Sequence, residues 1–243
     1  MRLLKFETLA STNQYCKLLD LTETEEFTII VASEQTAGKG QQGNHWESER
    51  GKNLTFSIVL KPTFMDPARQ YELTKALALG VSDVVGRKIG KGKEVRIKWP
   101  NDIYVGMRKI CGILVENHIG RRFESAVCGI GINVNQQQFA EWVPNPTSLL
   151  LETGRLHDLE PLLEETVAAI ADRYGTLQSG KEQEIDEAYL RRLLNYGIAH
   201  RYHYHGKDVV ATITGVDRWG HLELTSSNGE KMSCGMKEIV MMR

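Results

Sequence analysis

The sequence predicts an α+β fold in which a mixed, largely antiparallel sheet is flanked by helices and followed by a small β-rich unit. Three β-rich runs, at 95–100, 109–119 and 123–135, come in close succession, which favours a meander over repeated βαβ units. The run at 68–90 has Leu and Val at helical spacing, which predicts a long helix with one apolar face. Such elements pack as layers around a common core.

The remaining elements are predicted by the same two periodicities and by turn and cap residues. In chain order they are a helix at 11–21, strands at 27–34 and 53–62, and helices near 159–177 and 183–196.

The texture of the chain changes at Gly197. Beyond this residue, short alternating strands are separated by the turn-forming stretches HGKD, DRWG and SNGE, which is typical of a small barrel or meander. We therefore expect two domains, 1–196 and 197–243.

Composition and charge narrow the function classes. The 243 residues are 41% hydrophobic and carry 30 basic against 31 acidic side chains, a formal net charge of -1. Such a balance attracts neither nucleic acid nor an anionic membrane. No apolar run approaches the ~20 residues that cross a bilayer, and the N-terminus lacks the apolar core of a signal sequence. We expect a cytoplasmic protein with reduced cysteines and no nucleic-acid or membrane partner.

The stretch SEQTAGKGQQGNHW, residues 33–46, follows an apolar strand and is rich in glycines and amides. It is not a P-loop, because Lys39 lies between the first two glycines and no Ser or Thr follows it. Gly38, Gly40 and Gly43 match G-x-G-x-x-G by spacing alone, without the helix or acidic residue of a dinucleotide site. The composition allows a loop that closes around an anionic ligand, but this segment alone favours a plain surface hairpin.

Residues 96–102 read RIKWPND. Lys98 ends an apolar strand and faces away from Ile97 and Trp99 by strand alternation. Pro100 stops the ladder and PND forms a turn, so a cation, an amide and a carboxylate converge at one strand end. This combination suits a phosphate with magnesium, although a solvent-facing strand lysine gives the same pattern.

Several motifs occur in one order along the chain: STN at 11–13, SEQTAGKGQQGNHW, GKNLTFSIVL, KWPND, RKICGILVE and GIGINVN. Together they resemble the biotin protein ligases, the biotin–[carboxyl-carrier protein] ligase family, over essentially the whole chain. KWPND followed by KICGILVE is the most specific part. The resemblance implies a sheet like that of class II synthetases and biotin ligases, and an SH3-like β-barrel at the C-terminus.

The resemblance also implies a two-step reaction. The biotin carboxylate attacks the α-phosphorus of ATP to give biotinyl-5′-AMP, and a lysine of a biotin carboxyl carrier protein then takes the biotin. ATP, Mg²⁺ and biotin are the implied small molecules, and a homodimer is the implied assembly. Lys98 is the implied catalytic cation, because two mutually repelling anions must be brought together.

Roles are carried over residue by residue, with the 33–46 loop folding over the bound ligand and Trp46 covering the adenine side. Biotin contacts are expected from Ser11, Thr12, Asn13, Gln35, Gly38, Lys39, Gly40, Gln41, Lys98 and Gly112. Nucleotide contacts are expected from Lys39, Asn44, Trp46, Asn101 and Asn133. No permanent metal site is expected, and Asp102 is the one candidate ligand for Mg²⁺.

The loop departs from the common family pattern Gly-Arg-Gly-(Arg or Gln)-Arg-Gly by carrying Lys39 and Gln42. Lysine lacks the bidentate fork of arginine, and glutamine carries no charge. The departure puts tight retention of the adenylate in question, but not the chemistry.

Plain structural interpretations stay open for several of these residues. The side chains at 11–13 are equally explained as helix caps, Asn133 as part of a bulge and Asp102 as an Asx turn. The histidines at 200, 203 and 205 form either a metal site or, more simply, an ordinary barrel strand.

Two other functions stay open. A lipoate-type ligase shares the adenylation chemistry, and a catalytically silent ligand-sensing module would share the pocket. Some ligases of this family also repress transcription through an N-terminal winged helix. We expect none here, because the chain starts within a few residues of STN.

Overall fold

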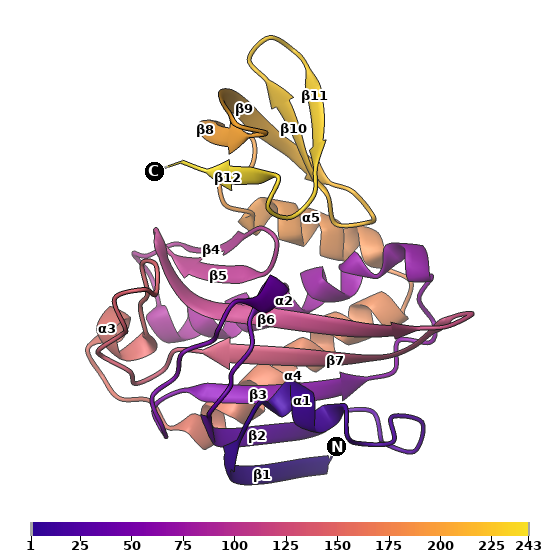
Figure 1. The fold of residues 1–243 in the computed structure, drawn as a ribbon, viewed down its shortest axis with the longest axis vertical. Helices are drawn as coiled ribbons and strands as arrows, with labels where there is room; N and C mark the ends of the chain where they lie inside the picture. The colour runs from indigo at the N-terminus through magenta and orange to yellow at the C-terminus, as the bar shows by residue number, and fades with distance from the viewer. Residues whose placement is uncertain (1, 243) are drawn as a thin grey trace.

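The computed structural model describes residues 2–242, with the side chain of Gln42 excepted. The chain forms a seven-stranded sheet and a five-stranded sheet, and most of its helices pack against one face of the larger sheet (Figure 1). This arrangement confirms the predicted α+β fold class. Within the described range, no helix has both the length and the apolar character needed to cross a membrane.

The large sheet has the strand order β1-β2-β3-β7-β6-β5-β4. Its strands are β1 (Arg2–Leu9), β2 (Thr28–Gln35), β3 (Leu54–Leu60), β4 (Val95–Lys98), β5 (Asp102–Val105), β6 (Arg108–Ile119) and β7 (Phe123–Ile132). Only β1 and β2 pair in parallel, and the other neighbours are antiparallel, as expected for a meander with short turns. β1 and β5 were not predicted, because β1 is a mostly exposed edge strand and β5 is very short.

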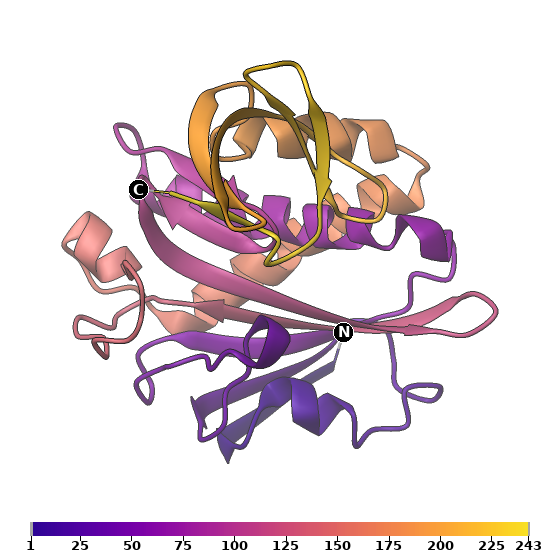
Figure 2. The same ribbon diagram turned by 45° about the horizontal axis from the view of Figure 1, so that its top comes forward.

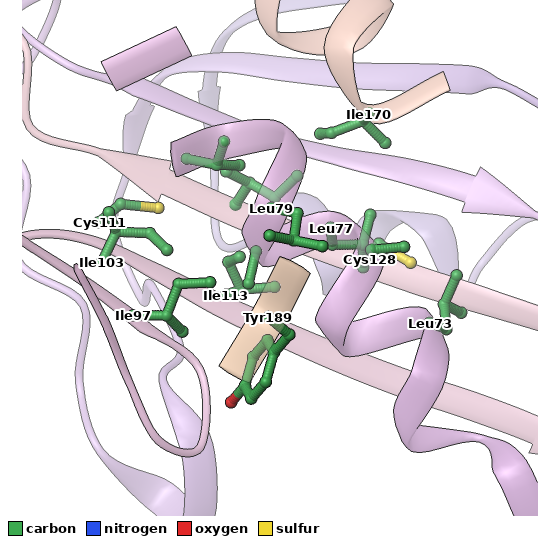
Figure 3. Close-up of a cluster of buried hydrophobic side chains, with 14 of the residues drawn as sticks. Leu73, Leu77, Leu79, Ile97, Ile103, Cys111, Ile113, Cys128, Ile170 and Tyr189 are labelled. Carbon is green, nitrogen blue, oxygen red and sulfur yellow. The ribbon is translucent and has the colours of Figure 1, made fainter. Parts of the chain in front are cut away.

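All α-helices except the first lie on the side of this sheet where the main core is enclosed. The helices are α1 (Thr12–Cys16), α2 (Tyr71–Ile89), α3 (Leu149–Thr153), α4 (Leu159–Gln178) and α5 (Glu182–Arg192), with 3₁₀ turns η1 (Gln41–Gly43) and η2 (Pro67–Arg69). Leu73 and Leu77 of α2 are enclosed with Ile113 and Cys128 of the sheet (Figure 3). Each such leucine contributes roughly 1.5–3 kcal/mol of burial. The predicted helix at 68–90 therefore forms for the predicted reason.

Helix α1 lies on the opposite face of the sheet and is shorter than predicted. The helix expected over 11–21 ends at Cys16, and Leu18 is 82% exposed. Ser11 occupies the N-cap position without a side-chain cap hydrogen bond. After the helix, Asp20 accepts hydrogen bonds from the backbone N–H (2.9 Å) and hydroxyl (2.6 Å) of Thr22, which turns the chain. The helix stops because Leu18 has no buried surface to pack against.

The small sheet has the strand order β11-β10-β9-β8-β12 and lies above the β4–β5 end of the large sheet (Figures 1 and 2). Its strands are β8 (Ala199–Tyr204), β9 (Lys207–Val216), β10 (Leu222–Ser226), β11 (Lys231–Cys234) and β12 (Ile239–Met241). Every neighbouring pair is antiparallel, which is consistent with an SH3-like unit. The short alternating strands predicted beyond Gly197 are thus present.

Two aromatic residues tie the small sheet to the turn after β4. The indole N–H of Trp99 donates to the carbonyl of Gly220 at 2.9 Å. The hydroxyl of Tyr71 donates to the carbonyl of Pro100 at 2.7 Å and lies 3.0 Å from the hydroxyl of Tyr189. A Cβ on Gly220 would lie 2.5 Å from the Tyr71 ring, and the φ of Gly220 is +89°, so only glycine fits this contact. The β4–β5 turn is therefore held from both sides.

Candidate active site

A cavity of about 250 Å³ opens on the face of the large sheet that carries α1. Its wall gathers nearly all of the residues predicted from the motifs, from segments far apart in the chain. They are Ser11, Thr12, Asn13, Gln35, Lys39, Gly40, Gln41, Asn44, Trp46, Lys98, Asn101, Asp102 and Gly112. Of the predicted set, Gly38 and Asn133 lie outside this wall. The site thus forms where the motif-bearing loops meet over the sheet.

The closed end of the cavity is a network of neutral hydrogen-bonding groups. The side-chain oxygen of Gln35 accepts from the backbone N–H of Thr12 at 2.8 Å and lies 3.2 Å from its hydroxyl. Ser57 Oγ lies 2.7 Å from the Thr12 hydroxyl and 2.6 Å from Asn13 Oδ1. Thr12, Asn13 and Ser57 are buried, and Gln35 is half-buried. Their hydrogen bonds orient the groups that line the cavity, which therefore present fixed donors and acceptors to a ligand. Ser57 was not predicted, because nothing in its strand sequence distinguishes it from a core position.

Glu116 at the end of the GILVE motif orients this network from behind. Its carboxylate accepts from Asn13 Nδ2 at 2.9 Å and pairs with Lys17 Nζ at 2.6 Å. Partial burial raises its pKa, but the hydrogen bonds from Lys17 and Asn13 outweigh burial and leave the pKa below its usual value. Glu116 is therefore ionised at neutral pH and fixes which way the Asn13 amide points.

Three glycines of the two central strands form the floor. Gly112 pairs with Gly131 across β6 and β7, and Gly129 lies on the same face. A Cβ on Gly131 would lie 2.4 Å from the Trp46 ring, and one on Gly112 would lie 3.1 Å from it. A Cβ on Gly129 would lie 2.3 Å from the Asn13 amide. The space above Gly112 that was expected to admit a ligand is partly taken by Trp46, so these glycines seat protein side chains as well.

The glycine loop folds as a hairpin whose end is Trp46. Gly40 N–H donates to the Asn44 carbonyl at 2.7 Å, and Trp46 N–H donates to the Gly38 carbonyl at 3.0 Å. A Cβ on Gly38 would lie 2.6 Å from the Trp46 carbonyl oxygen, so Gly38 shapes the hairpin instead of lining the cavity. The replacement of arginine by Gln42 concerns a side chain outside the described residues.

Three lysines line the cavity, and beside the exposed Lys39 of the glycine loop these are Lys98 and Lys109. Lys98 Nζ lies 3.5 Å from the hydroxyl of Tyr104 and 5.2 Å from the centre of its ring. Lys109 Nζ forms a 2.7 Å ion pair with Asp102 and lies 5.7 Å from the ring of Trp46. Lys109 was missed in the sequence, although it begins the KICGILVE motif. Asp102, for which an Asx turn and a magnesium ligand were both open, thus forms an ion pair in the structure.

A second cavity of about 770 Å³ continues from the first past Lys98 and Trp46. Asn133 lies on its wall and is only 4% exposed. Its amide Nδ2 donates to the Thr147 carbonyl at 3.0 Å, while its Oδ1 is buried with no hydrogen-bond partner among the described residues. A buried amide oxygen without a partner is costly, which marks it as an acceptor for a ligand.

Trp142 also lines the larger cavity and was not predicted. It is 57% exposed, and its ring centre lies 5.9 Å from that of His45. An exposed aromatic ring beside an apolar wall of Phe139 and Val143 is suited to stack on a flat heterocycle. The signal that could have found it is a tryptophan in the proline-rich stretch WVPNP after the last motif.

The residues from 2 to 242 contain no group of three His, Cys, Asp or Glu side chains placed to hold a metal ion. The histidines of β8 have other contacts: His203 lies 2.9 Å from Asp208, and His200 lies 2.9 Å from the carbonyl of Met242. A magnesium ion that arrives with a polyphosphate needs only one or two protein carboxylates. Asp102 at the cavity mouth is the acidic side chain available for this, in exchange for its pairing with Lys109.

Comparison with known proteins places the chain among relatives. A family model described as the biotin/lipoate A/B protein ligase family matches residues 5–133. The bifunctional ligase/repressor BirA of Bacillus subtilis is 33% identical over 178 residues, which is 72% of this chain and 50% of that protein. The chain thus spans about half the length of that relative. The biotin–[acetyl-CoA-carboxylase] ligase of Paracoccus denitrificans is 31% identical over 69% of this chain and 71% of its own length.

Solved structures share the whole architecture. The biotin protein ligase of Aquifex aeolicus in complex with biotin and ATP has a TM-score of 0.82 and 24% identity, covering 100% of this chain and 99% of that one. The Leishmania major biotin protein ligase in complex with biotinyl-5-AMP has a TM-score of 0.65 and 22% identity, covering 96% and 98%. Both therefore share the overall fold of this chain over nearly its full length.

Proposed function

The chain belongs to the biotin/lipoate A/B protein ligase family, and from this membership we propose that it is a biotin–[biotin carboxyl-carrier protein] ligase. It activates biotin with ATP to biotinyl-5′-AMP and transfers the biotin to a lysine of a biotin carboxyl carrier protein. The observation that carries this proposal is the placement of Lys98 where the polar cavity and the larger cavity with the unpartnered Asn133 oxygen meet.

The smaller cavity suits the ureido head and bicyclic ring of biotin. Thr12 and Gln35 supply oriented hydroxyl and amide groups on the cavity wall, which a neutral polar head group needs when it is buried, and Ser57 is hydrogen-bonded to the Thr12 hydroxyl. The glycine floor keeps the bicyclic ring close to the sheet. The carboxylate tail would then extend toward Lys98 at the mouth.

The larger cavity suits the adenine and ribose of ATP. The free acceptor on Asn133 matches the exocyclic amine of adenine, and Trp142 offers a face for the ring. Trp46 lines both cavities, so it lies between the two ligands instead of on the adenine side alone.

In the first step a biotin carboxylate oxygen attacks the α-phosphorus, and the bond from that phosphorus to the bridging oxygen breaks as pyrophosphate leaves. The reactants are both anions, so the barrier is lowered by fixed positive charge that acts most strongly as charge concentrates between them. Lys98 and Lys109 supply two ammonium groups there. Asp102 would hold a magnesium ion here, and that ion would supply neutralisation of part of the leaving-group charge.

In the second step the neutral amine of the acceptor lysine attacks the acyl carbon of biotinyl-5′-AMP. The C–N bond forms, the C–O bond to the phosphate breaks, and AMP leaves with the electron pair. The lysine ammonium loses two protons to solvent overall. The glycine-loop hairpin over the cavity limits competing attack by water.

The test uses purified protein with ATP, Mg²⁺, biotin and an unmodified carrier domain, and mass spectrometry of the carrier. We expect the carrier to gain one biotin on one lysine. Lys98→Ala should abolish biotin-dependent release of pyrophosphate without loss of the fold. Near-normal release would assign the role to another group, and the same assay on Lys109→Ala shows whether it is that lysine. Lipoate in place of biotin separates the lipoate-type alternative, and no turnover with either acid favours a ligand sensor.

The proposal extends to assembly, location and domain division. β1 is the outermost strand of the large sheet, and an edge strand is a template for pairing with a second copy. We infer a homodimer formed in this way, in the cytoplasm, with a catalytic domain at 1–196 and an SH3-like domain at 197–243. Sedimentation of the wild type against a Leu3→Lys variant on the edge strand tests the dimer.

A further inference from the structure

A third cavity, of about 400 Å³, lies between the two sheets and opens beside Lys98. We propose that this cavity binds the acceptor polypeptide by enclosing an apolar side chain next to its target lysine. The inference rests on the proposed function, because it assigns a place to the second substrate of that reaction.

The three cavities meet at shared side chains. Lys98 and Asn44 line all three cavities, so the three spaces converge on the same two side chains. Gln41, Trp99 and Pro100 are also shared between the biotin-type cavity and the cavity between the sheets. The proposed reaction has three substrates, because biotin and ATP react at the α-phosphorus and the acceptor lysine then attacks the acyl carbon of the bound adenylate. Biotin and ATP account for the first two cavities, and the third remains for the acceptor.

The wall of the cavity between the sheets is mainly apolar. The inner part is formed by Ile213, Leu222 and Ile239 of the small sheet, which are buried, together with the half-buried Leu194. Enclosing an apolar side chain in this surface is favourable, because apolar area is removed from water. A polyphosphate would lose its hydration there without gaining hydrogen bonds from the apolar side chains. An apolar residue beside the target lysine therefore fits this wall better than a nucleotide tail does.

The wall of this cavity also carries one buried polar group, the hydroxyl of Tyr202. Tyr202 lines the cavity at 2% exposure, and its hydroxyl has no hydrogen-bond partner among the described residues. Burial raises the pKa of Tyr202 to about 12, so the hydroxyl remains a donor at neutral pH. A phenylalanine would fill the same space without this cost, so the hydroxyl is suited to a carbonyl of the incoming chain.

The mouth of the cavity is open and positively charged. Met236 and Lys237 lie on the exposed turn between β11 and β12, and both reach the cavity. A partner that presents an acidic side chain near its target lysine is attracted to this mouth, which helps to orient it. The target lysine then points toward Lys98 and the activated carboxyl group.

The experiment separates the two half-reactions with cavity variants. Met236→Trp narrows the mouth from an exposed position, and Val210→Trp places the same side chain on an exposed site of the small sheet away from the cavity. Lys237→Glu is matched with Lys231→Glu in the same way. For each variant, pyrophosphate release is measured with biotin and ATP while hydroxylamine discharges the adenylate, and transfer is measured with an unmodified carrier domain.

We expect Met236→Trp to lower kcat/KM for the carrier by about tenfold or more, the size of effect that loss of an anchor side chain has at an interface. Pyrophosphate release with hydroxylamine should stay at the wild-type rate, and Val210→Trp should change neither. A carrier variant with serine on both sides of its target lysine should lower kcat/KM by the same factor when it is tested with the wild-type protein. With Met236→Trp, the same carrier variant should cause no additional decrease in kcat/KM.

Tyr202→Phe keeps the inference testable if the tryptophan variant fails to fold. It should raise the KM for the carrier by roughly threefold to tenfold while the melting temperature stays the same or rises, because a buried group without a partner is removed. Full transfer by both variants would overturn the inference. Loss of pyrophosphate release in Met236→Trp would assign the cavity to the nucleotide instead. A wild type that releases no pyrophosphate with biotin would overturn the proposed function itself.

Discussion

The unpartnered oxygen of Asn133 predicts that the enzyme distinguishes ATP from a nucleotide without the 6-amino group. Purine riboside triphosphate differs from ATP only by the absence of that amine. With ATP, Asn133 Oδ1 gains a donor, whereas with the analogue it stays buried and unpaired at 4% exposure. A buried acceptor left without a donor costs about 1–3 kcal/mol. Since about 1.4 kcal/mol is tenfold, kcat/KM should fall by roughly fivefold to a hundredfold.

The assay is biotin-dependent pyrophosphate release at varied nucleotide concentration, with both nucleotides and with the wild type and Asn133→Ala. The variant removes the acceptor, so its two kcat/KM values should converge. Its loss of the 3.0 Å bond to the Thr147 carbonyl is monitored by thermal unfolding, since this bond anchors the loop after β7. Equal kcat/KM for the two nucleotides with the wild type would refute the assignment of Asn133 to the base.

Three further substitutions test the packing and the charges around the site. Gly131→Ala should weaken biotin binding by roughly fivefold to a hundredfold in calorimetry, because its Cβ would lie 2.4 Å from the Trp46 ring and the ring must move; Gly175→Ala, where a Cβ has open space, is the control and should leave binding unchanged. Lys75→Met should destabilise the fold by about 3–5 kcal/mol in urea unfolding, because it leaves the buried Glu72 carboxylate without its 3.0 Å partner; a change below 1 kcal/mol would contradict this. Glu116→Gln should remove a part of the folding stability that depends on pH, because the folded state lowers the pKa of Glu116. The contribution of Glu116 to stability is complete above the unfolded pKa of about 4.3 and is lost as the pH falls through the lower folded pKa. The free energies of unfolding of the wild type and the variant should therefore converge at the acid end of this range.

The motifs predicted most of the site because they contain residues with few structural alternatives. Lys98 ends a strand that must stop at a proline, and Asn101 and Asp102 follow it, so their convergence was visible in the letters KWPND. The floor glycines Gly129 and Gly131 of GIGINVN were not predicted as site residues, although glycine in a central strand needs a close neighbour. What the letters could not show was which neighbour, and Trp46 proved to occupy the space above Gly112.

Other parts of the site depend on contacts across the fold. Ser57 and Lys109 belong to ordinary strand sequences, and only the sheet register places them beside residues of α1 and the β4–β5 turn. Trp142 lies in a loop without periodicity. The length of α1 was mispredicted for the same reason, because the exposure of Leu18 depends on what the large sheet leaves uncovered.

The hydrogen bond from Trp99 to Gly220 has a consequence for how the chain tolerates local opening. When the small sheet detaches from α5 and the β4–β5 hairpin, the indole loses its acceptor, and the peptide carrying Lys98 loses one of its two supports. Partial unfolding of the C-terminal strands and inactivation are then the same event. Amide exchange at the 217–220 loop should follow the activity as denaturant is raised, well before the α2 amides exchange.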